Sequence, residues 1–107
     1  MFTRVVECTI KPGKTQDFFE SFQDEVLPIL QKQQGFTDET VLVSQNNQNE
    51  LLAISYWKTE EDGERYHREV FPEISGILKP MLATDPRVRT FTVRHSLTHK
   101  ISAAKAA

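Results

Sequence analysis

The spacing of apolar residues along the chain predicts four β-strands and two helical regions. In a strand apolar and polar residues alternate or β-branched residues cluster, whereas a helix repeats an apolar residue every three or four positions. The expected elements are a strand at 2–10, a helix from Thr15 to near Gly35, strands at 36–45 and 51–57, a helix from Thr59 to Asp85 and a strand at 91–97. This order, β-α-β-β-α-β, predicts an α+β, ferredoxin-like domain with an antiparallel sheet and two helices on one face.

Capping and helix-breaking residues refine the two helical regions. Thr15 is expected to cap the first helix, and Thr59, with Asp62 three residues later, resembles a capping box at the start of the second. Pro28 and Pro72 lie inside the helical patterns and lack a backbone donor. Each proline therefore predicts a kink or a break.

The length of the chain leaves room for one domain. A chain of 107 residues can build one hydrophobic core, and no linker or repeat interrupts the pattern. We therefore expect one domain over residues 1–97. Residues 98–107 show no periodicity and are expected to form a flexible tail.

Several strand residues are apolar on both sides of the expected sheet, as where Val5 adjoins Val6. Two helices cover only one face, so the second face needs another cover, and a second copy of the chain supplies it with one self-complementary surface. The sequence thus predicts a homodimer. We expect the shared face to carry Val5, Ala53 and Trp57 together with a polar set consisting of Thr3, Glu7, Thr9, Ser55, Thr90, Thr92 and Arg94.

Apolar walls with a few polar groups are typical of a pocket for a small organic ligand. Trp57 beside Glu7 and Arg94 would supply both kinds of surface. The alternative is that Glu7 and Arg94 only neutralise each other across adjacent strands.

Composition narrows the possible partners. Thirteen basic and fifteen acidic residues are scattered along the chain, so we expect no nucleic-acid partner. No segment has the roughly 20 apolar residues of a membrane span, and the start of the chain lacks a signal-peptide pattern. The single cysteine, Cys8, cannot form an internal disulfide and is expected to be a small buried residue. These features favour a cytoplasmic protein without membrane contact.

Three short motifs resemble the antibiotic biosynthesis monooxygenase family. They are Ile10-Lys11-Pro12-Gly13-Lys14, Gln34-Gly35-Phe36 and Ser55-Tyr56-Trp57-Lys58-Thr59-Glu60, in that order along the chain. The resemblance covers about residues 2–97. It implies a homodimeric α/β barrel with a cavity between sheet and helices. In some members it also implies oxidation of phenols or quinols by dioxygen without metal or flavin, so no cofactor is expected.

The resemblance also suggests residue roles. Trp57 matches the tryptophan that ends the third strand of the family. Many members place a histidine nine residues later, where this chain has Tyr66 followed by His67, and an acidic residue two positions before, where it has Ser55. Haem-degrading relatives use an Asn on the first strand and a Trp and a His on the second helix. This chain has Val6 or Glu7, Tyr66 and no later helical histidine in those places, so haem binding is not expected.

The candidate site residues follow from these considerations. The catalytic candidates are Trp57, Tyr66, His67 and Glu7, and the substrate-binding candidates are Trp57, Arg94, Thr92 and Phe71. As alternatives, Tyr66 is a core aromatic with its hydroxyl at the surface, and His67 belongs to a solvated helix face. His95 and His99 lie on or after a strand, where their spacing does not build a zinc helix motif, so no metal is expected.

Two functions fit the sequence. The first is a cofactor-independent monooxygenase that acts on a small aromatic, phenolic or quinol substrate. The second is a non-catalytic dimeric binding or stress-response module that holds a small apolar molecule in the same cavity. A base held in a dry pocket would distinguish them, because proton removal starts the oxidation.

Overall fold

Four antiparallel strands form one sheet in the order β2-β3-β1-β4. The computed structural model describes residues 1–101 of the chain. The strands are β1 (Phe2–Thr9), β2 (Phe36–Val43), β3 (Glu50–Trp57) and β4 (Arg87–Thr92). The turn at 44–49 joins β2 to β3 as a hairpin, as expected. The order of elements confirms the predicted ferredoxin-like fold.

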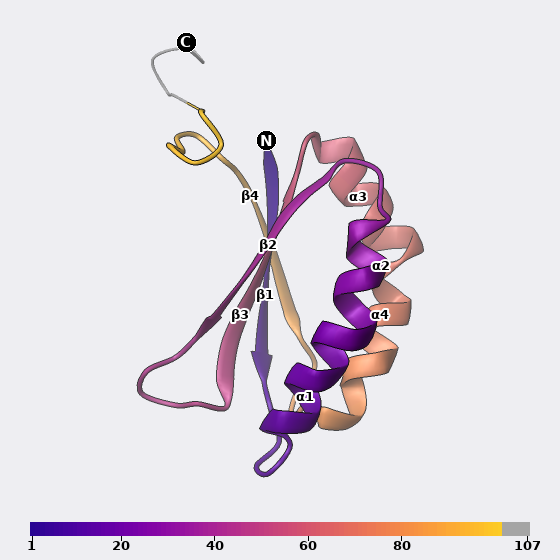
Figure 1. The fold of residues 1–107 in the computed structure, drawn as a ribbon, viewed down its shortest axis with the longest axis vertical. Helices are drawn as coiled ribbons and strands as arrows, with labels where there is room; N and C mark the ends of the chain where they lie inside the picture. Colours follow the sequence, from indigo (N-terminus) through magenta and orange to yellow (C-terminus); the bar gives the residue numbers. More distant parts are fainter. Residues whose placement is uncertain (102–107) are drawn as a thin grey trace.

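The helices cover one face of this sheet, as Figure 1 shows. The first helical region consists of α1 (Thr15–Ser21), a π-helical turn η1 (Phe22–Val26) and α2 (Leu27–Gln31). The second consists of α3 (Glu60–Glu69), α4 (Phe71–Leu78) and a 3₁₀ turn η2 (Lys79–Met81). The other face of the sheet carries no helix of the described residues (Figure 1).

Both prolines interrupt their helices as predicted. The wide π-helical turn ends two residues before Pro28, which lacks the N–H that an α-helix needs at this position. Pro72 lies in the first turn of α4, where the missing donor costs nothing, and α3 ends just before it. The Thr59 hydroxyl accepts a hydrogen bond from the Asp62 N–H (3.1 Å), which confirms this cap. The expected Thr15 cap is wrong, because Thr15 Oγ1 donates to Asn49 Oδ1 instead (3.2 Å).

The last strand begins earlier than predicted and ends earlier. It runs from Arg87 to Thr92, not from 91 to 97. Its partner within residues 1–101 is β1, in a register that pairs Glu7 with Arg87 and Phe2 with Thr92. The strand ends where its ladder with β1 ends, at the pair formed by Phe2 and Thr92. Of the expected tail, residues 98–101 belong to a turn closed by backbone hydrogen bonds between Ser96 and Ile101, and residues 102–107 lie outside the described part.

The register assigns each strand residue to one face of the sheet. Arg4 pairs with Ser55, and Phe2 with Trp57, and these residues point toward the helices. The opposite face, which we call the open face, carries Thr3, Val5, Glu7, Leu52, Ile54, Tyr56, Arg87, Arg89 and Phe91. Placing Ala53, Ser55, Thr90, Thr92 and Trp57 beside Val5 was therefore wrong. Strand β3 is apolar on both sides, so its sequence did not reveal which side faces the helices.

The core lies between the helices and the inner face of the sheet. Trp57 and Phe18 are its largest fully buried side chains, with relative exposures of 0% and 1%. Cys8 is also buried, as predicted, and burial raises the pKa of its thiol to about 11. A thiol with so high a pKa is mostly unreactive at neutral pH.

Two helical glycines provide a test of how closely α3 approaches the sheet. A Cβ added to Gly63 would clash with the Phe2 ring, whereas one added to Gly76 would meet nothing within 4 Å. Gly63→Ala should therefore destabilise the protein by about 1–3 kcal/mol through overpacking. Gly76→Ala should stabilise it by about 0.5–1 kcal/mol because alanine favours helix. Urea unfolding measures both, and equal effects would contradict the close contact.

Candidate functional site

Arg4 is a buried cation at the centre of the inner face of the sheet. Its relative exposure is 2%, and it extends from β1 toward α3 and α4. The guanidinium carbon lies 5.0 Å from the centre of the Tyr66 ring and 4.5 Å from that of Phe71. Contacts of this kind stabilise a desolvated cation by about 2 kcal/mol or more. Two aromatic rings therefore hold the Arg4 charge away from water.

His67 is the hydrogen-bond partner of this cation. Arg4 Nη2 lies 2.9 Å from His67 Nδ1. Because a guanidinium can only donate, Nδ1 accepts this bond and the imidazole proton resides on Nε2. His67 is exposed as a residue, but partial burial of its ring, and then the Arg4 charge, lower its pKa. The imidazole is therefore neutral at pH 7, and its ring stacks on Phe71 at 5.7 Å.

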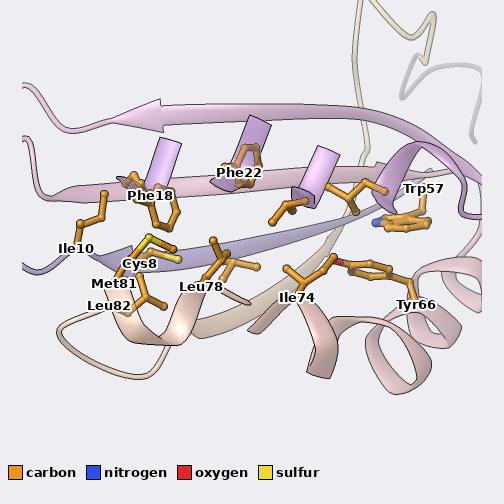
Figure 2. Close-up of a cluster of buried hydrophobic side chains, with 14 of the residues drawn as sticks. Cys8, Ile10, Phe18, Phe22, Trp57, Tyr66, Ile74, Leu78, Met81 and Leu82 are labelled. Atoms are coloured by element: carbon orange, nitrogen blue, oxygen red, sulfur yellow. The ribbon is translucent and has the colours of Figure 1, made fainter. Parts of the chain in front are cut away.

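Tyr66 lies on the core side of Arg4, one residue before His67. Its ring is 4% exposed and stacks on Trp57 with 4.7 Å between ring centres. In Figure 2 its hydroxyl points along the core toward Ile74. The alternative with the hydroxyl at the surface is thus wrong. Burial raises the pKa of the Tyr66 phenol, so the group stays protonated.

Trp57 packs against the face of the Tyr66 ring. It is completely buried, its indole N–H donates to Ser55 Oγ (2.9 Å), and Phe36 packs edge-on against it. This is the setting of a core residue. Its part in substrate binding or catalysis stays a prediction.

Glu39 faces the same region from β2. The ladder between β2 and β3 skips Thr37, a bulge after which Glu39 pairs with Ser55 and points toward the helices. Burial raises the pKa of Glu39 from 4.5 to about 8, and the nearby Arg4 charge only partly offsets this. Within residues 1–101, Glu39 Oε2 and Arg4 Nε are buried without a hydrogen-bond partner. Buried polar atoms are rarely left unpaired, and exceptions often mark functional sites.

Arg4 lines two cavities, which we call the inner cavity and the outer cleft. The inner cavity has a volume of about 40 Å³ and is lined by apolar core residues and, at one end, by Arg4, Glu39, Ser55 and Tyr66. The outer cleft has a volume of about 520 Å³ and is lined by Phe2, Arg4, Gly63, Glu64, His67, Arg68, Val88 and Thr90. The cleft has room for an aromatic molecule, whereas the inner cavity has room only for a few small molecules the size of water.

The structure brings Trp57, Tyr66, His67 and Phe71 together and leaves the other candidates elsewhere. Glu7 lies on the open face, where its Oε2 is 3.9 Å from Arg87 Nε, so the expected Glu7–Arg94 pair is wrong. Thr92 and Arg94 are exposed, and neither lines the inner cavity or the outer cleft.

The remaining histidines lie apart from the site. His99 stacks on Tyr56 with 5.1 Å between ring centres, and His95 is exposed. In the part of the chain that the structure describes, no three His, Cys, Asp or Glu side chains gather as metal ligands.

Sequence analysis did not identify Arg4 and Glu39. The signal for Arg4 was present, because it shares the alternating positions of Phe2, Val6 and Cys8, and a charge in such a series is unusual. Glu39 gave no such signal, because the bulge at Thr37 changes the alternation of β2.

The raised pKa of Glu39 predicts a specific pH dependence of stability. The folded state holds a proton that the unfolded state releases near pH 4.5, so this stabilisation is complete below that pH and is lost as pH rises through about 8. Between about pH 5 and pH 8, the free energy of unfolding should fall in the wild type relative to Glu39→Gln. Urea unfolding at several pH values measures this difference. Glu64→Gln, at an exposed position, should run parallel to the wild type, and a parallel Glu39→Gln curve would contradict the assignment.

Comparisons with known proteins agree with this architecture. A Natronomonas pharaonis protein named for heme binding is 30% identical over 80 residues, which are 74% of this chain and 13% of that protein. The chain thus spans a small part of that relative. SnoaB, a cofactor-independent oxygenase from Streptomyces nogalater, has a TM-score of 0.75 at 22% identity, over 90% of this chain and 95% of its own. A monooxygenase from the gene ActVA-Orf6 of Streptomyces coelicolor, solved with nanaomycin D, has a TM-score of 0.69 at 19% identity, over 90% and 89%.

No helix within residues 1–101 has the length and apolar character of a membrane span.

The structural similarities show the fold, and a family model extends the relationship to sequence. The family model described as antibiotic biosynthesis monooxygenase matches residues 1–70, which is more than half of the chain. The chain therefore belongs to the antibiotic biosynthesis monooxygenase family.

Proposed function

We propose that the chain is a cofactor-independent monooxygenase that oxidises a phenol or quinol bound in the outer cleft. The observation that carries this proposal is the bond between the buried Arg4 guanidinium and the neutral His67 imidazole at the wall of the cleft. A cation next to an available base is what phenol activation needs, because the base removes the proton and the cation holds the phenolate.

The substrate hydroxyl takes the place of the Arg4–His67 hydrogen bond. Its oxygen accepts from Arg4 Nη2, and its O–H donates to the Nδ1 atom that Arg4 has released. The proton then passes to the imidazole, and the phenolate stays against the guanidinium. Because the pKa of His67 is lowered, the imidazole is neutral and ready to accept this proton at pH 7.

Oxidation follows from the phenolate, which gives an electron to dioxygen far more readily than the phenol does. Formation of a C–O bond at a ring carbon gives a hydroperoxide, and loss of water leaves a quinone. The overall reaction converts one phenol and one dioxygen into one quinone and one water. This balance uses neither a metal nor a flavin. That the chain requires no cofactor and binds no heme stays a prediction.

The contacts of Glu7 and His67 favour a second function. Glu7 is near Arg87, and His67 is bonded to Arg4, so both acid–base candidates named from the sequence already have a partner. A cleft with these contacts could hold an aromatic ligand without reacting. A non-catalytic binding or stress-response module is therefore the alternative, and oxygen uptake separates it from the enzyme.

The open face supports a homodimer as the working assembly. Leu42 and Phe91 are 48% and 42% exposed at its two sides, and Ile54 and Tyr56 lie between them, only partly buried. We expect a second copy to cover these residues. Light scattering at micromolar concentration should give twice the mass of the chain, and Ile54→Lys should shift the protein toward the monomer. A monomeric wild type would contradict this assembly.

Oxygen uptake with hydroquinones and polyphenols tests the proposed function. The wild type should consume dioxygen above the spontaneous rate, and added chelator should not change the rate. His67→Ala should lower uptake by about 10²-fold, as is typical for loss of a general base. His95→Ala removes an exposed histidine outside the cleft and should leave uptake unchanged. Uptake equal to the protein-free rate across the panel would support the binding module instead.

A further inference from the structure

The inner cavity is the feature that the proposed reaction does not yet use. Its walls come from both layers of the core and are apolar over most of their area, with Phe18, Val26, Ile74 and Leu78 among them, whereas the polar groups gather at one end. Its volume of about 40 Å³ is too small for an aromatic ring, given that an engineered apolar cavity that binds benzene measures about 150 Å³. The apolar part of such a cavity offers water no hydrogen-bond partner and admits small apolar molecules such as xenon. Dioxygen is a co-substrate of this size and polarity.

We propose that the inner cavity is the dioxygen site of this oxygenase, with the side chains of Arg4 and Glu39 at its polar end. The inference rests on the proposed function. Arg4 lines both the inner cavity and the outer cleft, so it adjoins the phenol on one side and dioxygen on the other. Cavity and cleft are therefore neighbours across a single side chain.

This proposal gives a role to the two unpaired polar atoms, Arg4 Nε and Glu39 Oε2. The phenolate transfers one electron to dioxygen, which becomes superoxide, and the phenolate becomes a phenoxyl radical. Arg4 Nε, which is buried without a partner within residues 1–101, donates a hydrogen bond to the superoxide anion. The Glu39 carboxyl supplies a proton, which turns superoxide into a hydroperoxyl radical. The raised pKa of Glu39 keeps that proton in place at pH 7.

The remaining steps return every group to its starting state. The hydroperoxyl and phenoxyl radicals combine through a C–O bond at the ring, and the hydroperoxide loses water to give the quinone. The proton that His67 took from the phenol goes back to Glu39. One dioxygen is consumed for each phenol, and no external reductant is needed.

Methyl NMR under gas pressure tests the site without any substrate. Dioxygen is paramagnetic, so the methyl groups of Ile74 should relax faster under oxygen than those of Ile54, which lies on the open face. Xenon should shift the Ile74 methyl signals and leave those of Ile54 unchanged. Equal relaxation at both isoleucines, or a water signal at Ile74 with no xenon shift, would overturn the proposal.

Kinetics then test whether dioxygen in the cavity is the reacting molecule. Ala53→Val adds two methyl groups to the cavity wall, and Ala83→Val makes the same change at an exposed site. Ala53→Val should raise the KM for dioxygen about tenfold, equivalent to about 1.4 kcal/mol, and leave the KM for the phenol unchanged. An unchanged oxygen dependence in Ala53→Val would overturn the role of the cavity.

The two proposals fail in different ways. If no phenol is oxidised while Ile74 still responds to both gases, the proposed function fails. If the phenol is oxidised but Ile74 responds no more than Ile54, only the dioxygen site fails. Because the gas measurements use the wild type, they do not depend on whether Ala53→Val folds.

Discussion

Arg4→Met should lower kcat/KM for phenol oxidation by about 10²–10³-fold and leave the protein folded. Removing one preorganised donor from a developing anion typically costs this much. Arg4 holds the phenolate through Nη2 in the proposed reaction, and its contacts with His67, Tyr66 and Phe71 fix its position. Methionine has a similar length but no charge. Replacing a buried charge by an apolar side chain is often neutral or stabilising, so the loss should appear in the rate.

The controls separate charge from shape. Arg94→Met removes an exposed arginine outside the cleft and should leave kcat/KM unchanged. Arg4→Lys keeps the charge but loses the forked geometry, so it should retain only part of the activity. Steady-state oxygen uptake and urea unfolding of each variant give the two readouts. Full activity of Arg4→Met would remove Arg4 from the mechanism.

Trp57→Ala should cost about 3–5 kcal/mol of unfolding free energy, the range for loss of a fully packed aromatic side chain. A domain of this size is stable by only about 5–15 kcal/mol, so much of the stability is lost. Three contacts disappear together: the stacking on Tyr66, the edge contact with Phe36 and the hydrogen bond to Ser55. Urea unfolding followed by circular dichroism measures the change.

Tyr56 provides a matched control for this prediction. It is the neighbouring aromatic on β3, but it lies on the open face and is only partly buried. Tyr56→Ala should therefore cost less than half as much as Trp57→Ala. Similar losses for the two variants would mean that Trp57 is not a packed core residue. In that case the role of Trp57 as a substrate-binding candidate would gain support.

The element order could be predicted because each element repeats its own period. Alternation in β1 and the spacing of three or four residues in the helices do not depend on distant contacts. The extent of β4 could not be predicted, because it depends on the register in which β4 pairs with β1. Which side of β3 faces the helices could not be predicted either. Both sides are apolar, and only the pairing with β1 distinguishes them.

The candidate site was predictable in part for a related reason. Tyr66, His67 and Phe71 could be located because helical period and family motifs place them near the end of β3. Arg4 and Glu39 were missed because a charged residue is ordinarily taken as exposed. Burial of these two side chains becomes evident only when the aromatic rings around Arg4 and the register of β2 are known.

The position of the extra residue in β2 decides which side chain lies opposite Ser55 on the inner face. A shift of one residue moves every side chain of a strand to the other face. Deleting Thr37 would close the bulge and join Phe36 directly to Asp38 and Glu39, with their present pairing to β3 intact. Moving the same extra residue to the far end of β2 would instead turn Glu39 outward and bring Asp38 and Thr40 inward. Relatives in which the extra residue lies at the far end of β2 would therefore place Asp38 instead of Glu39 opposite Ser55, without any substitution.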